Sequence, residues 1–226
     1  MRPWVHLASA VAPGGGTLRL MRRDHEFSIR LADGNELMNS RFGGSEEALA
    51  TLAMAGVGPR AHPQVLIGGL GMGFTLRAAQ AVAPPDARLV VAELVPELVG
   101  WAETHMPEVF GTCLSDPRVH VHIGDVGAVL RQNAGSFDAI LMDVDNGPEG
   151  LTRAENAALY RADGLRAARG ALRAGGVLAV WSAAGDTAFA KRLAGCGFDV
   201  ATHRVRARRT GRGARHTIWI ATPTAD

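Results

Sequence analysis

Five short apolar runs, each followed by a segment with helical spacing, constrain the fold of this chain more than any other feature of its sequence. The runs cover residues 64–69, 87–94, 118–125, 137–145 and 175–182. Each run is shorter than a typical helix, and the segments between them repeat apolar residues as amphipathic helices do. Strands that are apolar almost throughout are buried on both faces, as in a parallel sheet covered by helices. The pattern therefore predicts an α/β fold with a Rossmann-like sheet.

Two further strands, at 199–207 and 214–222, follow these runs and are joined only by the segment 208–213. A connection this short makes the two strands antiparallel neighbours. The predicted sheet thus has seven strands, mostly parallel, and ends in a C-terminal antiparallel hairpin. This layout resembles that of class I S-adenosylmethionine-dependent transferases.

The first part of the chain has a different pattern and predicts a small β appendage. Residues 17–22 and 26–31 alternate apolar and polar side chains, and Asp33-Gly34 is a strong hairpin signal. We therefore expect an N-terminal β-hairpin appendage over residues 1–42.

A helix is expected directly after the appendage. Ser45 can cap it, Glu46 and Glu47 suit its first turn, and Gly56 can end it. The helix opens the second predicted domain, a Rossmann-like S-adenosylmethionine-binding catalytic domain over residues 43–226. A long helix is also expected over 154–172, ahead of the fifth apolar run.

Composition limits where such a chain works and what it binds. No apolar run approaches the ~20 residues that a membrane span needs. Cys113 and Cys196 have no metal-ligand spacing and suggest free thiols in a reducing compartment. The formal net charge of +2 gives no global field for nucleic acid. We expect a cytoplasmic enzyme without a metal, a membrane contact or a nucleic-acid partner.

The loop after the first apolar run contains the pattern G-x-G-x-G, formed by Gly69, Gly71 and Gly73. Glycines let the chain turn sharply and approach a ligand closely, and the next helix presents free N–H groups there. The dinucleotide pattern requires a third glycine at position 74, where this chain has Phe74. The loop therefore favours an adenosyl ligand over NAD or FAD.

Two carboxylates end the second and third runs. Glu93 can accept both hydroxyls of a ribose, the alternative being an ordinary surface residue. Asp125 can accept the amino group of adenine, cap the following helix, or do both. The residues next to them, Leu94 and Val126, are expected to line the same site. Because strand ends meet at one sheet edge, glycine loop, Glu93 and Asp125 together indicate an adenosyl site.

Asp143 and Asp145 follow the fourth run and are the predicted catalytic residues. A carboxylate beside a sulfonium cofactor can hold the cofactor, or it can orient and deprotonate an amine nucleophile. Asp143 is also a candidate cofactor ligand. The structural alternatives are that Asp143 ends the strand and Asp145 caps the turn. Residues 146–149 lack an aromatic residue that could stack on a flipped base, which disfavours a base substrate.

Several blocks resemble the spermidine synthase family, the polyamine aminopropyltransferases. They are VLIGGLGMG, VVAELVPELVGWA, DPRVHVHIGDV and FDAILMDVDNGPEG, within roughly residues 35–182. The resemblance implies a Rossmann-like catalytic domain with a small N-terminal β domain, and aminopropyl transfer from decarboxylated S-adenosylmethionine to an amine. It also implies ribose, adenine and catalytic roles for Glu93, Asp125 and Asp143, and a homodimer.

The chain departs from the family at the parts that bind polyamine. Met72 stands where the family's glycine loop usually has an aspartate for the aminopropyl amine. The segment from Asp143 to Asn146 is one residue shorter than the family's catalytic loop, and the family's tyrosine-glutamine pair is absent. On these grounds the sequence favours methyl transfer from S-adenosylmethionine to a small, possibly amine, substrate, with Met72 packed beside the cofactor. Aminopropyl transfer and a non-catalytic cofactor-fold binding protein are the alternatives.

Six arginines lie between residues 204 and 215. They could form a patch for an acidic substrate or RNA, or a solvated hairpin loop. The sequence favours the solvated loop and does not name the acceptor substrate.

Overall fold

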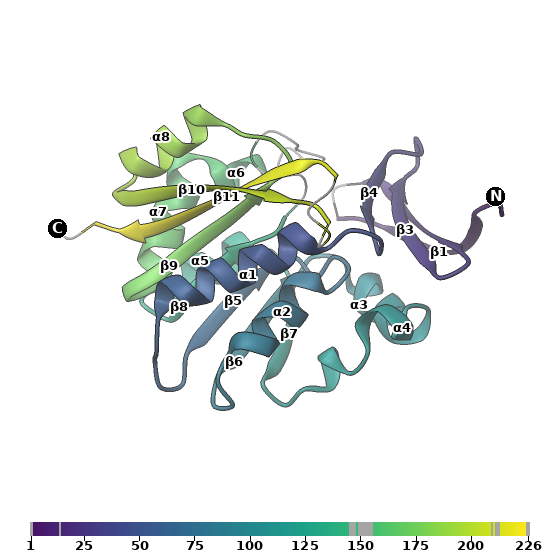
Figure 1. Ribbon diagram of the computed structural model, residues 1–226, viewed down its shortest axis with the longest axis horizontal. Helices are drawn as coiled ribbons and strands as arrows, with labels where there is room; N and C mark the ends of the chain where they lie inside the picture. Colours follow the sequence, from purple (N-terminus) through teal and green to yellow (C-terminus); the bar gives the residue numbers. More distant parts are fainter. Residues whose placement is uncertain are drawn as a thin grey trace.

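The computed structural model describes residues 2–13, 15–144, 148, 156–208, 210 and 213–224, and its core is a seven-stranded sheet (Figure 1). The strands are β5 (Gln64–Gly68), β6 (Arg88–Glu93), β7 (Val119–Ile123), β8 (Phe137–Met142), β9 (Leu172–Ser182), β10 (Phe198–Arg206) and β11 (Arg215–Pro223). Their order in the sheet is β10-β11-β9-β8-β5-β6-β7. The five strands from β9 to β7 are parallel, and β11 is antiparallel to both β9 and β10. The predicted fold class is confirmed.

Helices cover both faces of this sheet (Figure 1). They are α1 (Gly44–Val57), α2 (Phe74–Val82), α3 (Pro96–Thr104), α4 (Pro107–Phe110), the 3₁₀ turn η1 (Cys113–Ser115), α5 (Val126–Gln132), α6 (Ala157–Tyr160), α7 (Ala162–Ala171) and α8 (Thr187–Gly195). Alternate residues of β5 enter two separate cores, because side chains alternate across a strand. Val65 and Ile67 pack in the core that includes α1, α2 and α3. Leu66 packs in the core that includes α5, α7 and α8.

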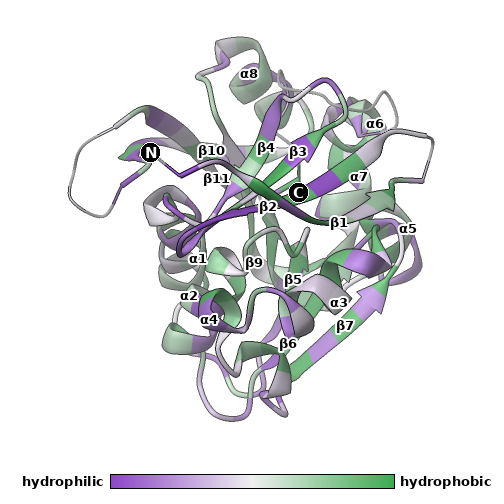
Figure 2. Ribbon diagram, turned by 90° about the vertical axis from the view of Figure 1, so that its right-hand side faces the viewer, coloured by the Kyte–Doolittle hydropathy of each residue, from purple (hydrophilic) through white to green (hydrophobic). Residues whose placement is uncertain are grey.

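The edge strand β7 differs from the central strands. In Figure 2, bands of hydrophobic and hydrophilic colour alternate along it, as its sequence VHVHI requires. Strand β8 in the sheet centre is buried at all six positions. The contrast explains why the central runs read as continuous apolar segments.

A second, antiparallel sheet forms the N-terminal part, with the order β1-β2-β3-β4. Its strands are β1 (Val5–Val11), β2 (Thr17–Arg23), β3 (Glu26–Leu31) and β4 (Glu36–Asn39). The sheet is larger than the predicted hairpin, because β1 was not expected. Leu20, Phe27 and Ile29 are fully buried and join the same core as α1. The division into two domains at residue 42 stays a prediction.

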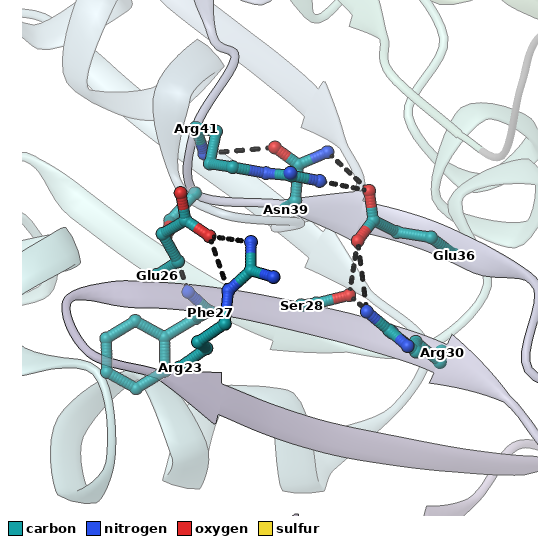
Figure 3. Close-up of polar contacts among 9 residues, drawn as sticks. Arg23, Glu26, Phe27, Ser28, Arg30, Glu36, Asn39 and Arg41 are labelled. Carbon is teal, nitrogen blue, oxygen red and sulfur yellow. Dashed lines mark hydrogen bonds and ion pairs between the residues drawn. The ribbon is translucent and has the colours of Figure 1, made fainter. Parts of the chain in front are cut away.

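The carboxylate of Glu36 ties β4 to its neighbours (Figure 3). Its Oε2 accepts a 2.6 Å hydrogen bond from the Ser28 hydroxyl, and its Oε1 accepts 2.9 Å bonds from Asn39 and Arg41. Arg30 adds an ion pair at 3.8 Å. These contacts fix the strand that carries residues 37–39 toward the pockets described below.

Three local predictions were wrong. Ser45 does not cap α1: the cap is Gly43, without a side-chain bond, and Ser45 is buried in the first turn. Gly56 does not end α1, because the helix continues to Val57 and its C-cap is Gly58. The helix expected over 154–172 is two helices, because Arg161 is extended between α6 and α7, and its last residue already belongs to β9.

The two cysteines are free and buried. Among the described residues, no helix has the length and apolar character needed to cross a membrane.

Candidate functional site

Two adjoining pockets open where the strand order reverses, between β5 and β8. The carboxyl ends of parallel strands at such a point form the usual ligand crevice of an open α/β sheet. Pocket A, about 180 Å³, has among its lining residues Gly69, Glu93, Leu94, Asp125, Val126 and Asp143. Pocket B, about 480 Å³, has among its lining residues Phe42, Glu46, Met72, Asp143, Trp181 and His216. Leu37, Met38, Gly71 and Asp143 line both.

The glycine loop brings the end of β5 against the end of β8. Gly69 has a φ of +90°, and a Cβ there would lie 2.6 Å from the carbonyl oxygen of Asp143. Only glycine fits this approach without displacing the chain. Gly71 lines both pockets, whereas Gly73 starts α2, faces the Phe110 ring and is not among the lining residues of either pocket.

Glu93 is buried, with both carboxylate oxygens turned to the backbone. Oε2 accepts a 2.9 Å bond from the Leu70 amide, and Oε1 accepts a 2.8 Å bond from the Val95 amide. Burial raises the pKa of Glu93, and these amide bonds oppose the rise. A carboxylate has about four acceptor positions, so Glu93 can accept from a further donor beside these amides. The surface alternative for Glu93 does not hold, because 6 % of the residue is exposed.

Asp125 caps α5, with Oδ1 accepting a 2.8 Å bond from the Ala128 amide. Its side chain also lines pocket A, so capping leaves it available to a ligand. Leu94 and Val126 add apolar surface beside the two carboxylates. The strand ends therefore bring together Gly69, Glu93 and Asp125 in one pocket.

Asp143 lies directly after β8, where the two pockets meet. Its Oδ2 accepts a 2.6 Å bond from the Thr75 hydroxyl, and its amide donates to the carbonyl of Gly68. It is half-buried and lines both pockets. Burial raises the pKa of Asp143 to about 6, and the Thr75 bond limits the rise. Asp145 lies outside the described residues.

Glu46 lines pocket B, whereas the sequence analysis predicted only that it lies in the first turn of a helix. Its Oε2 lies 2.5 Å from the Ser45 hydroxyl, which is 2.8 Å from Nδ1 of His216. Burial, followed by the charge of Asp143, raises the pKa of Glu46 to about 7. Two glutamates in the first turn were the only local signal for this residue, since His216 is 171 residues away from Ser45.

The remaining wall of pocket B is largely apolar and aromatic. The sequence predicted Met72 beside the cofactor, but Met72 is almost fully buried and lines pocket B, and it is not among the residues lining pocket A. Trp181 also lines pocket B. The ring of Trp181 meets that of His216 edge-on, with centroids 4.8 Å apart. Its Nε1–H is buried without an acceptor among the described residues. A buried donor without an acceptor is uncommon in proteins.

Four described residues of the arginine-rich segment 204–215 line pocket B, and Arg208 is the one arginine among them; the others are Ala207, Gly213 and Ala214. Arg208 lines pocket B and lies 4.4 Å above the Phe42 ring. Within the described chain, no group of three His, Cys, Asp or Glu side chains could hold a metal.

Comparison with known proteins decides the family. Residues 48–193 match the family model described as spermine/spermidine synthase domain, which is more than half of the chain. The chain belongs to the spermine/spermidine synthase family. The resemblance in the sequence is thereby confirmed.

Two curated proteins and one solved structure are similar to this spermine/spermidine synthase family member. A polyamine aminopropyltransferase of Nitrosomonas europaea is 36% identical over 97 residues, 43% of this chain and 28% of the relative. One from Clostridium tetani is 32% identical over 85 residues, 36% of this chain and 30% of the relative. The chain thus aligns with less than a third of either relative. The spermidine synthase structure from Thermotoga maritima has a TM-score of 0.74 at 19% identity, covering 98% of this chain and 74% of that one.

The names of these relatives bear on the choice between the two predicted transfer reactions. Both curated relatives are named aminopropyltransferases, so the comparisons favour the aminopropyl alternative over the methyl transfer that the sequence first suggested. The homodimer stays a prediction.

Proposed function

We propose that this chain transfers an aminopropyl group from decarboxylated S-adenosylmethionine to an amine. The observation that carries the proposal is the position of Asp143, which lines both pockets. A carboxylate at that junction can face a donor in pocket A and an acceptor in pocket B at once.

Pocket A has the chemistry of an adenosyl site. Glu93 offers two acceptor oxygens for ribose hydroxyls, and Asp125 offers an acceptor for an adenine amino group. Leu94 and Val126 supply apolar contacts for a purine. These residues fit decarboxylated S-adenosylmethionine, and Gly69 and Gly71 would let the backbone approach it closely.

When bound, decarboxylated S-adenosylmethionine supplies an aminopropyl group on a sulfonium that a nucleophile can displace. The contribution of the chain is to hold the amine. Asp143 would accept a hydrogen bond from an N–H group of the amine and so align the nitrogen for attack. Its negative charge would also stabilise the positive charge that develops on this nitrogen. The apolar wall around Met72 and Trp181 would keep water from the reacting atoms.

Met72 also supports a second candidate, methyl transfer from S-adenosylmethionine. Its buried thioether lines pocket B, the proposed acceptor pocket, and offers no charge to the ammonium of a polyamine.

Product analysis tests the proposal and separates the candidates. The purified chain is incubated with either donor and a panel of mono- and diamines, and the nucleoside products are separated by chromatography. Aminopropyl transfer gives 5′-methylthioadenosine from the decarboxylated donor. S-adenosylhomocysteine formed from S-adenosylmethionine would favour the second candidate, and calorimetric donor binding without either product would favour a non-catalytic binding protein.

A further inference from the structure

The first turn of α1 meets β11 through three polar side chains in a row. Ser45 is fully buried, with its hydroxyl between Oε2 of Glu46 and Nδ1 of His216. A hydroxyl has one hydrogen, so it donates to one neighbour and accepts from the other. With Glu46 ionised, Ser45 donates to the carboxylate and the Nδ1–H of His216 donates to Ser45. The arrangement thus requires a hydrogen on Nδ1 of His216, which the neutral ring carries in its Nδ1–H tautomer.

The surroundings of His216 agree with this state. Burial lowers the pKa of His216, which favours the neutral ring near pH 7. The edge-on contact with Trp181 restricts the orientation of the imidazole. One oxygen of Glu46 is therefore fixed by Ser45, and the other oxygen, Oε1, is left for pocket B.

Two carboxylates, Glu46 and Asp143, then face pocket B among apolar and aromatic side chains. Like charges in such a place repel each other, as the effect of Asp143 on Glu46 shows. A cation bound between them relieves this repulsion. An ammonium group has three donors and suits two carboxylates.

We infer that Glu46 binds the ammonium of the acceptor opposite Asp143 and takes its proton, with Ser45 and His216 as positioning residues that fix the Glu46 carboxylate. The inference rests on the proposed function, because it assigns roles within the same site. It commits Glu46 to the acceptor, since Glu46 lines pocket B and is not among the residues lining pocket A.

The proton transfer balances within the site. One N–H bond of the ammonium breaks, an O–H bond forms on Glu46, and the electron pair stays on nitrogen as the lone pair that attack requires. Asp143 stays ionised beside it and aligns the amine. When two neighbouring carboxylates have different pKa values, one can exchange a proton while the other stays ionised.

The charged groups that face Glu46 set the pH dependence of this step. Asp143 at the end of β8 and Glu47 on α1 raise the pKa of Glu46, whereas the Ser45 bond lowers it. Neutral His216 on β11 and Arg208 complete the charged and titratable lining of pocket B near Glu46 within the described residues. Loss of the Ser45 hydroxyl therefore raises the pKa of Glu46.

Kinetics of three variants test the assignment, at saturating donor and over pH 5.5–9. Glu46→Gln lowers kcat/KM for the amine about 100-fold, with donor affinity by calorimetry within twofold of wild type. Ser45→Ala moves the acidic limb of the kcat/KM profile up by roughly one pH unit. Glu103→Gln, an exposed glutamate on α3, is the charge-matched control and leaves both quantities unchanged. A rise in donor Kd for Glu46→Gln with unchanged amine kinetics would overturn the assignment, as would an unmoved limb in Ser45→Ala.

A measurement on the free protein separates this inference from the proposed function. The ¹⁵N shifts of the His216 ring report its tautomer, and the ¹³C shift of the Glu46 carboxyl reports its titration. We expect the Nδ1–H tautomer in wild type, and a higher Glu46 pKa in Ser45→Ala. If no amine is turned over, the proposed function fails, while these shifts still decide whether Ser45 and His216 hold Glu46. An Nε2–H tautomer in wild type, or identical Glu46 titrations, contradicts the positioning role.

Discussion

The Thr75 hydroxyl on α2 donates a 2.6 Å hydrogen bond to Oδ2 of Asp143 at the end of β8. The helix that follows the glycine loop thereby fixes the carboxylate where the two pockets meet. Thr75 is almost fully buried, so no bulk water replaces the bond when it is removed.

Thr75→Val keeps the shape of the side chain and removes its donor. Because the bond lowers the pKa of Asp143, its loss raises that pKa above the present value of about 6. We expect kcat/KM at pH 7 to fall about tenfold and its acidic limb to move to higher pH. Thr75→Ser retains the hydroxyl and serves as the control. Equal profiles for the Val and Ser variants would rule out this role for Thr75.

Gly69→Ala tests the close approach of β5 and β8. The variant adds a Cβ 2.6 Å from the Asp143 carbonyl oxygen, at a positive φ. Gly34→Ala is the matched control: its φ is +91°, and a Cβ there meets nothing within 4 Å. Both variants lose about 1–2 kcal/mol from backbone strain, and Gly69→Ala alone loses turnover because it displaces Asp143. Denaturant unfolding and kcat measure the two effects, and full activity in Gly69→Ala would exclude the displacement.

The sheet and the grouping of the residues that line pocket A were predictable from the sequence for a common reason. Central strands are buried on both faces, so they appear as apolar runs, and their carboxyl ends meet at one edge whatever the loops do. Glu93, Asp125 and Asp143 could therefore be grouped by their positions at the ends of these runs. Their placement required no knowledge of contacts between distant residues.

The rest of the site depends on such contacts. Ser45 has the residue type of a helix cap, but the fold buries it against His216 on the last strand. The break at Arg161 escaped prediction because the apolar spacing continues across it. That break accompanies a 2.9 Å bond from the Tyr160 hydroxyl to the Val144 carbonyl, which local spacing does not encode.

The stability of the free protein should depend on the protonation of Glu46. Its pKa is raised from 4.5 to about 7, so the folded state binds more protons than the unfolded chain between these values. This contribution to stability is complete below pH 4.5 and is lost as the pH rises through 7. Glu46→Gln removes the repulsion with Asp143 and should stabilise the free protein at pH 8 by about 1–2 kcal/mol.

Denaturant unfolding of both proteins at pH 6 and pH 8 measures this effect. The gain from Glu46→Gln should be smaller at pH 6, where the wild-type side chain is mostly protonated. A variant that is less stable than wild type at pH 8 would contradict the raised pKa.

Asp138 anchors the opposite ends of the strands and offers a stability prediction outside the pockets. Its Oδ1 accepts a 2.7 Å bond from Arg60, and its Oδ2 accepts bonds of 2.8 Å from Arg173 and from the Gln64 amide. Asp138→Asn leaves the charges of Arg60 and Arg173 without their partner. Because only 1 % of Asp138 is exposed, water does not replace the lost carboxylate charge. We expect a loss of about 3 kcal/mol in unfolding free energy, with donor affinity unchanged in the folded variant. A loss below ~1 kcal/mol would mean that the hydrogen bonds and ion pairs of Asp138 add little to the stability of the fold.

Single-turnover kinetics of Asp143→Asn test the central claim most directly. The variant keeps the volume and the Thr75 contact but removes the negative charge at the junction of pockets A and B. With decarboxylated S-adenosylmethionine and an amine that wild type uses, we expect donor affinity within about threefold and a rate about a thousandfold lower. A wild-type rate in Asp143→Asn would contradict the account.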